Sequence, residues 1–132
     1  MKADTVKLSF TDGFKGELIS PSAKINIGQT ENGIQPYHML FGALGSCFYA
    51  TFLSVATKMR LTFGDVSIEI NGNKRDQTPA TLEWVEIKIV ISNPSDEDKL
   101  RKACDLGAKF CSIHETISKV ADMKLIVEFK HS

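Results

Sequence analysis

Polar and apolar residues alternate over residues 6–10 and again over residues 14–19, on either side of Asp12-Gly13. This alternation places every second side chain on one face of a strand, and Asp-Gly is typical of a tight hairpin turn. Residues 23–27 alternate in the same way. The pattern therefore predicts three short strands, followed by a polar, glycine-bearing loop over residues 28–35.

A long helix is predicted from Pro36 to about Arg60, since proline is favoured in the first turn of a helix. Its apolar positions recur at intervals of three and four, at Leu40, Ala43, Leu44, Cys47, Phe48, Thr51, Phe52 and Val55. The opposite side is also largely apolar, so this helix needs cover on most sides. A chain of 132 residues supplies little of that cover alone, which favours a homodimer.

The rest of the chain alternates again over residues 66–70 and 82–91, which predicts two long strands paired antiparallel. Asn93-Pro94-Ser95 opens a second helix, with acidic residues in its first turn and basic residues later, and the pattern fades at Gly107.

A third helix is predicted to begin near Ser112, because Ser112 to Glu115 has the spacing of a capping box. A strand over residues 123–129 ends the chain. The sum is an α+β protein of order β-β-β-α-β-β-α-α-β, in one domain covering residues 1–132.

Charge and composition exclude several classes of protein. The 16 basic and 16 acidic residues cancel, and no basic cluster is present, so nucleic acid is not an expected partner. Residues 1–6 lack the apolar run of a secretory signal, and the apolar stretch 39–56 is interrupted by glycine and hydroxyl residues. We therefore expect a cytoplasmic protein that does not span a membrane.

Cys47 lies in the middle of the long helix, after Gly42 and Gly45. Each glycine costs about 1 kcal/mol relative to alanine in a helix interior, so another element must approach this helix closely. Cys47 is then either a small buried apolar residue or a nucleophilic thiol. The second role needs a nearby positive charge or hydrogen-bond donor, because burial alone raises the pKa of a thiol.

The other two cysteines differ in their surroundings. Cys111 immediately precedes the expected cap Ser112, at the positive end of a helix dipole that would favour its thiolate. Alternatively, Cys111 packs apolarly at the helix entry. Cys104 shares no motif and is interpreted as core packing. No Cys-x-x-Cys or His-x-x-x-His pair and no phosphate-binding loop occurs, so neither a metal nor another cofactor is expected.

Two segments of the chain carry recognisable motifs, namely Pro36-Tyr37-His38-Met39-Leu40-Phe41-Gly42-Ala43-Leu44-Gly45-Ser46-Cys47-Phe48 and Phe110-Cys111-Ser112-Ile113-His114. The first resembles the central-helix signature of the OsmC/Ohr family of thiol-dependent peroxidases, and the second resembles the second cysteine motif of that family. The element order matches along essentially the whole chain. The resemblance implies an intertwined homodimer, with two long central helices packed against antiparallel sheets that both chains build.

The resemblance also implies roles for two residues. Cys47 matches the peroxidatic cysteine, which attacks a small organic hydroperoxide to give a sulfenic acid, and Cys111 matches the resolving cysteine, which forms a disulfide with it. An external dithiol would reduce the pair. The implied active site lies at the subunit interface, where an apolar pocket would select organic peroxides.

The chain differs from the family at the residues that would stabilise the thiolate of the peroxidatic cysteine. Peroxidases of this family carry a glutamate just after the proline and an arginine from an earlier segment, whereas here Tyr37 follows the proline and no arginine precedes Arg60. Lys15 or Lys24 would supply a charge without the fork of a guanidinium. His38 is an acid-base candidate, or simply a polar residue in the first turn.

Three functions remain open on the sequence. The first is a hydroperoxide reductase that uses Cys47 and Cys111. The second is a non-catalytic relative that binds a small apolar or electrophilic ligand, which the missing arginine and glutamate favour. The third is a purely structural dimer.

Overall fold

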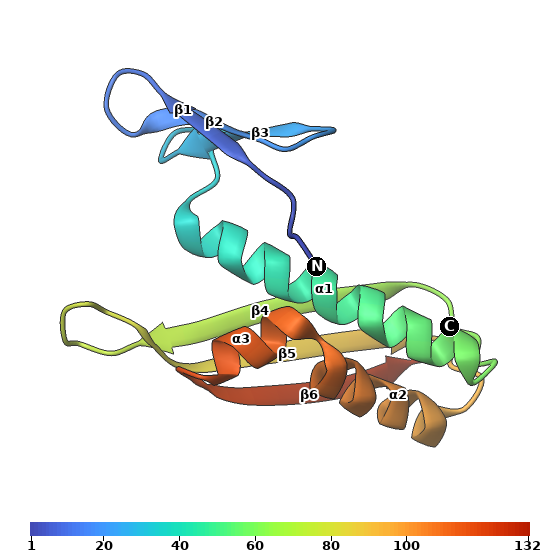
Figure 1. Cartoon of the computed structure of the whole chain (residues 1–132). Coiled ribbons are helices and arrows are strands. Elements are labelled where there is room, and N and C mark those ends of the chain that lie inside the picture. Colours follow the sequence, from blue (N-terminus) through green and yellow to red (C-terminus); the bar gives the residue numbers. More distant parts are fainter. The chain divides into compact units, whose positions relative to one another are not determined.

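The computed structural model describes residues 1–132 and confirms both the α+β class and the predicted order of elements (Figure 1). The elements are β1 (Lys7–Phe10), β2 (Lys15–Ile19), β3 (Lys24–Gly28), α1 (Pro36–Lys58), β4 (Val66–Lys74), β5 (Leu82–Ser92), α2 (Glu97–Phe110), α3 (Ser112–Ser118) and β6 (Asp122–Lys130). The chain divides into two compact units, Met1–Leu40 and Phe41–Ser132.

The first unit is an antiparallel sheet of order β1-β2-β3. Its hairpin turn has positive φ at both central residues, 51° at Asp12 and 78° at Gly13. Turns of this kind match the right-handed twist of the flanking strands, which is why Asp-Gly marks the hairpin in the sequence.

The second unit is built on a sheet of order β4-β5-β6, with the helices over one face (Figure 1). Alternate residues of β5 point to that face and are fully buried, namely Val85, Ile87, Ile89 and Ile91. One expected detail is wrong, since β5 and β6 pair in parallel and not antiparallel. The reason is that α2 and α3 connect these strands, and a helical crossover returns the chain in the same direction.

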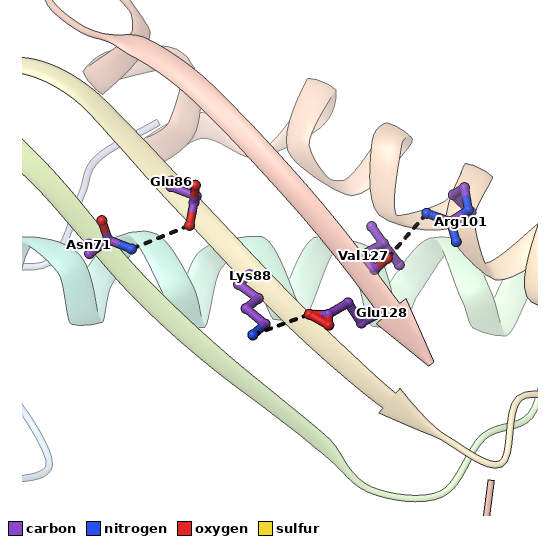
Figure 2. A network of polar contacts seen from close by, with 6 residues as sticks. All are labelled: Asn71, Glu86, Lys88, Arg101, Val127 and Glu128. Atoms are coloured by element: carbon purple, nitrogen blue, oxygen red, sulfur yellow. Dashed lines mark hydrogen bonds and ion pairs between the residues drawn. The ribbon is translucent and has the colours of Figure 1, made fainter. Parts of the chain in front are cut away.

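The other face of this sheet carries a set of polar contacts, as Figure 2 shows. Lys88 on β5 pairs with Glu128 on β6 at 3.2 Å, and Asn71 on β4 donates a hydrogen bond to Glu86 at 3.4 Å. The sheet is therefore apolar toward the helices and polar on its other side, as the alternating sequence pattern predicts.

The part of α1 in the second unit buries one stripe of side chains, Leu44, Phe48, Phe52 and Ala56. The predicted close approach is confirmed at Gly45, where an added Cβ would lie 3.0 Å from Ile70 Cδ1. At Gly42 such a Cβ would meet nothing within 4 Å. By length and composition α1 would also be able to cross a membrane, a test that the core helices of soluble proteins pass as well.

Both ends of α2 differ from the prediction. The helix begins after Asp96, whose carboxylate accepts a hydrogen bond from the Lys99 amide at 3.0 Å and so caps the first turn. It continues past Gly107 to Phe110. Gly107 is a packing site and not a helix end, because a Cβ there would lie 3.0 Å from Phe52 Cα on α1.

Candidate functional site

Cys47 lies on α1 at the border of the buried stripe, one residue before Phe48, and is partly exposed. The helix thus presents this residue at the edge of the core, where it is neither fully buried nor fully exposed. Neither of the two interpretations of this residue, buried packing or exposed thiol, is excluded by this position alone. The neighbours of the sulfur decide between them.

The junction of α2 and α3 supplies those neighbours. A single residue, Cys111, ends α2 and caps α3, and its sulfur accepts a hydrogen bond from the His114 amide at 3.4 Å. The expected cap, Ser112, is therefore wrong by one residue. The reason is that Cys111 has the extended backbone of a cap residue, with φ −74° and ψ 119°, while Ser112 is already helical.

Cys47 and this junction meet, although 65 residues separate Cys47 from Ser112 in the chain. The Cys47 sulfur lies 3.9 Å from the Ser112 hydroxyl oxygen. Burial raises the pKa of the Cys47 thiol, but hydrogen bonds from the Ile113 amide, the Cys111 thiol, and the hydroxyl and amide of Ser112 outweigh it and hold that pKa below its usual value. None of these donors is a cation.

The pKa of Cys111 moves in the opposite direction. Burial raises it, and the hydrogen bond and negative charge of Cys47 raise it further, against the lowering effect of the His114 and Ile113 amides. Burial and the neighbouring Cys47 thus outweigh the amides at the start of α3, which lower the pKa of the Cys111 thiol as expected. The Ile113 amide also lowers the pKa of Cys47, so Cys47 is the more readily ionised of the two thiols.

Cys104 confirms the packing interpretation given to it. It is fully buried on α2, and burial together with the charge of Asp105 raises its pKa to about 12, against a smaller lowering by Arg101. A thiol in this state carries almost no thiolate near neutral pH.

The other predicted site residues lie in the first unit. Lys15 begins β2 opposite Gly28, and Tyr37 lies in the first turn of α1. His38 has a structural contact, since its Nδ1 accepts a hydrogen bond from the Gln35 amide at 3.1 Å, as in the reciprocal half of a capping box. Any action of these three residues on Cys47 stays a prediction.

Lys24, the other lysine considered, forms an exposed ion pair with Glu17 at 3.3 Å. The structure gathers no three His, Cys, Asp or Glu side chains that would hold a metal ion. Among the groups near Cys47, the Ser112 hydroxyl and the Ile113 amide were not predicted as its partners. The capping pattern placed a positive helix end at residue 112, but it gave no sign of which thiol that end would face.

A groove of about 730 Å³ lies between α1 and β4. Phe41, Gly42 and Tyr49 of α1 and Ile68 and Ile70 of β4 are among its lining residues. Neither Cys47 nor Cys111 lines it. The groove is therefore distinct from the thiol pair.

Comparison with protein-family models gives a match to the OsmC-like protein family over residues 28–125. The chain belongs to this family. The match includes all of α1 and both cysteine segments. The comparison with curated proteins finds no match.

Several solved structures have the same fold. A hypothetical protein from Aquifex aeolicus VF5 is 26% identical, with a TM-score of 0.89 over 100% of this chain and 99% of that one. An OsmC like protein from Mycoplasma pneumoniae is 20% identical, with a TM-score of 0.82 over 98% and 97% of the two chains. An organic hydroperoxide resistance protein OsmC from Legionella pneumophila is 15% identical, with a TM-score of 0.75 over 97% and 98%.

Proposed function

We propose that this OsmC-like protein reduces organic hydroperoxides, with Cys47 as the peroxidatic and Cys111 as the resolving cysteine. The observation that carries the proposal is the arrangement of the two thiols: the Cys47 sulfur is partly exposed, has a lowered pKa and lies 3.9 Å from the hydroxyl of Ser112, and the preceding residue, Cys111, has a raised pKa. The name of the Legionella pneumophila protein, which refers to organic hydroperoxide resistance, agrees with it.

In the first step the Cys47 thiolate attacks the terminal oxygen of the hydroperoxide. A sulfur–oxygen bond forms and the peroxide bond breaks, which leaves Cys47 as a sulfenic acid and releases an alkoxide. The alkoxide takes up the proton of the nearby Cys111 thiol and leaves as the alcohol. Cys111 thereby becomes a thiolate.

In the second step the Cys111 thiolate attacks the sulfur of the Cys47 sulfenic acid. The disulfide forms and hydroxide leaves, to be protonated to water. An external dithiol then reduces the disulfide by thiol–disulfide exchange and becomes oxidised itself. The Cys47 sulfur lies 3.9 Å from the hydroxyl of Ser112, the residue that follows Cys111, so we propose that a movement of the α2–α3 junction brings the two sulfurs of one chain into a disulfide.

A homodimer is part of the proposal. Large apolar side chains remain exposed in the single chain, among them Leu8, Phe10, Phe14 and Leu53, and the space at Gly42 is not filled by the chain's own side chains. A second copy would cover such surface. We further propose one domain, a cytoplasmic location, and neither nucleic acid nor membrane as a partner.

The test is peroxide consumption driven by dithiothreitol, with cumene hydroperoxide and hydrogen peroxide as alternative substrates. We expect the wild type to consume the organic peroxide faster. Cys47→Ser should abolish turnover, and Cys111→Ser should leave a Cys47 sulfenic acid that dimedone traps. Cys104→Ala is the matched control, because it removes a thiol with no part in the cycle. A wild-type rate no better than that of free cysteine would contradict the proposal.

The groove between α1 and β4 favours a second candidate function, the non-catalytic binding of a small apolar ligand. Such a ligand would raise the melting temperature of the protein without being consumed. Ile70→Asp, which places a charge in the groove, should remove that stabilisation. If turnover is found and groove variants leave it unchanged, this second candidate is not needed.

A further inference from the structure

The hydroxyl of Ser112 has an unusual partner for a helical serine or threonine. Several other hydroxyls in these helices donate to a backbone carbonyl of the preceding turn, for example Ser46 to Gly42 at 2.8 Å and Thr116 to Ser112 at 3.0 Å. Ser112 is the first residue of α3, and its hydroxyl instead faces the sulfur of Cys47 at 3.9 Å. No competing carbonyl holds its proton.

We propose that Ser112 is a positioning residue for the Cys47 nucleophile, with its hydroxyl donating a hydrogen bond to the thiolate. This inference rests on the proposed peroxidase function and names a group that fills part of the role of the absent arginine. A hydroxyl can donate a hydrogen bond to the thiolate and can accept one from the thiol, so Ser112 can bond to the Cys47 sulfur in both of its protonation states.

The position of Ser112 in the chain adds to this role. Its amide and the amide of Ile113 also contribute to the lowered pKa of Cys47, so one helical turn presents three donors to one sulfur. The same turn follows Cys111 directly. The group that holds the nucleophile and the sulfur that resolves it are therefore adjacent in the chain, at the junction of α2 and α3.

A neutral donor stabilises a thiolate less than a buried cation, but it also carries a smaller desolvation cost. Loss of one hydrogen bond to a charged group corresponds to roughly a 10-fold change in the thiolate equilibrium. The effect should therefore be measurable as a shift in the pH dependence of Cys47 reactivity, without loss of the fold.

The experiment measures the rate of Cys47 alkylation by iodoacetamide against pH, with the modified peptide quantified by mass spectrometry. In Ser112→Ala we expect the midpoint to move to higher pH and the rate at about pH 6 to fall roughly 5- to 10-fold. At high pH, where the thiol is fully ionised in either protein, the two rates should converge. Ser112→Thr keeps the hydroxyl and should restore the wild-type profile.

Ser118→Ala is the matched control, because it removes the same hydroxyl from the same helix, where it donates only to the Glu115 carbonyl. Far-UV circular dichroism confirms that each variant is folded. A Ser112→Ala profile that superimposes on the wild type, or a shift shared by Ser118→Ala, overturns the role of Ser112 while the peroxidase proposal stands. An ordinary thiol midpoint in the wild type overturns both.

Discussion

Cys104 and Cys47 show how differently one protein treats the same side chain. Cys104 lies inside α2, where burial and a neighbouring carboxylate raise its pKa to about 12. Cys47 is also penalised by burial, but it faces the first turn of α3, and its pKa falls. The difference is not depth alone, since peptide and hydroxyl donors from a helix start reverse the effect of burial. Both sulfurs lie on helices, so the decisive feature is what faces each of them.

The largest expected consequence is in chemical reactivity. With Cys104 about three pKa units above an ordinary thiol, its thiolate fraction near neutral pH should be about a thousandfold smaller. We expect iodoacetamide to modify Cys47 rapidly in the native protein and Cys104 only after unfolding, as peptide mass spectrometry would show. Since the pKa of Cys47 is lowered, its rate should reach half its maximum below the usual thiol range. Native labelling of Cys104 at a similar rate would remove the contrast.

Serine substitution should lower the free energy of unfolding more at Cys104 than at Cys47, although Cys47 is the more reactive thiol. Cys104→Ser places a hydroxyl in an apolar interior and should cost about 1–3 kcal/mol of unfolding free energy. Cys47→Ser should stay within about 0.5 kcal/mol, because the site is partly exposed and already has donors and acceptors. Urea unfolding followed by circular dichroism measures both. Equal losses would mean that Cys47 is a packing residue as well.

The glycines that surround the two sites provide a further comparison. In Gly107→Ala the new Cβ would press on the Phe52 backbone at 3.0 Å, so we expect a loss of about 1–2 kcal/mol despite the better helix propensity of alanine. In Gly42→Ala nothing within 4 Å opposes the new group. The monomeric unit should gain up to about 1 kcal/mol there. Thermal unfolding of the two variants at low protein concentration would measure this difference.

The smallest effect concerns the cap of α3. Cys111→Ala removes the sulfur that accepts a hydrogen bond from the His114 amide and should cost about 0.5–1 kcal/mol of unfolding free energy. Cys111→Ser keeps a hydrogen-bond acceptor, and serine is favoured at the N-cap position. Hydrogen exchange of the His114 amide, followed by NMR, reports the cap directly. We expect faster exchange in the alanine variant alone. Equal protection in the two variants would show that the cap does not depend on this side chain.

Much of the fold could be predicted because each element carries its own local pattern. Alternation marked β4 and β5, Asp12-Gly13 marked the hairpin, and Pro36 marked the start of α1. The end of α2 could not be predicted, since Gly107 looks like a helix end until its contact with Phe52, 55 positions earlier, is known. The residues of β6 likewise give no sign that this strand pairs with β5 in parallel.

The candidate site divides in the same way. Cys47 and Cys111 could be selected from the sequence through their motifs. The opposite shifts of their pKa values could not be predicted, because these depend on how deeply each sulfur is buried and on which donors of the packed chain reach it. A local pattern identifies a helix start, but only the packed chain shows what that start faces.

The crossover between β5 and β6 links the thiols to the end of the chain. Residues 97–118 form its two helices, and β6 begins only four residues after α3 ends. Nine residue pairs between β5 and β6 hold β6, which follows the two helices, in the sheet. Without β6 the segment that carries Cys111 would be a loose C-terminal tail, tethered at one end only. Removal of residues 122–132 should therefore separate the two sulfurs, although not one of the deleted residues touches either of them in the hydrogen-bond network described above.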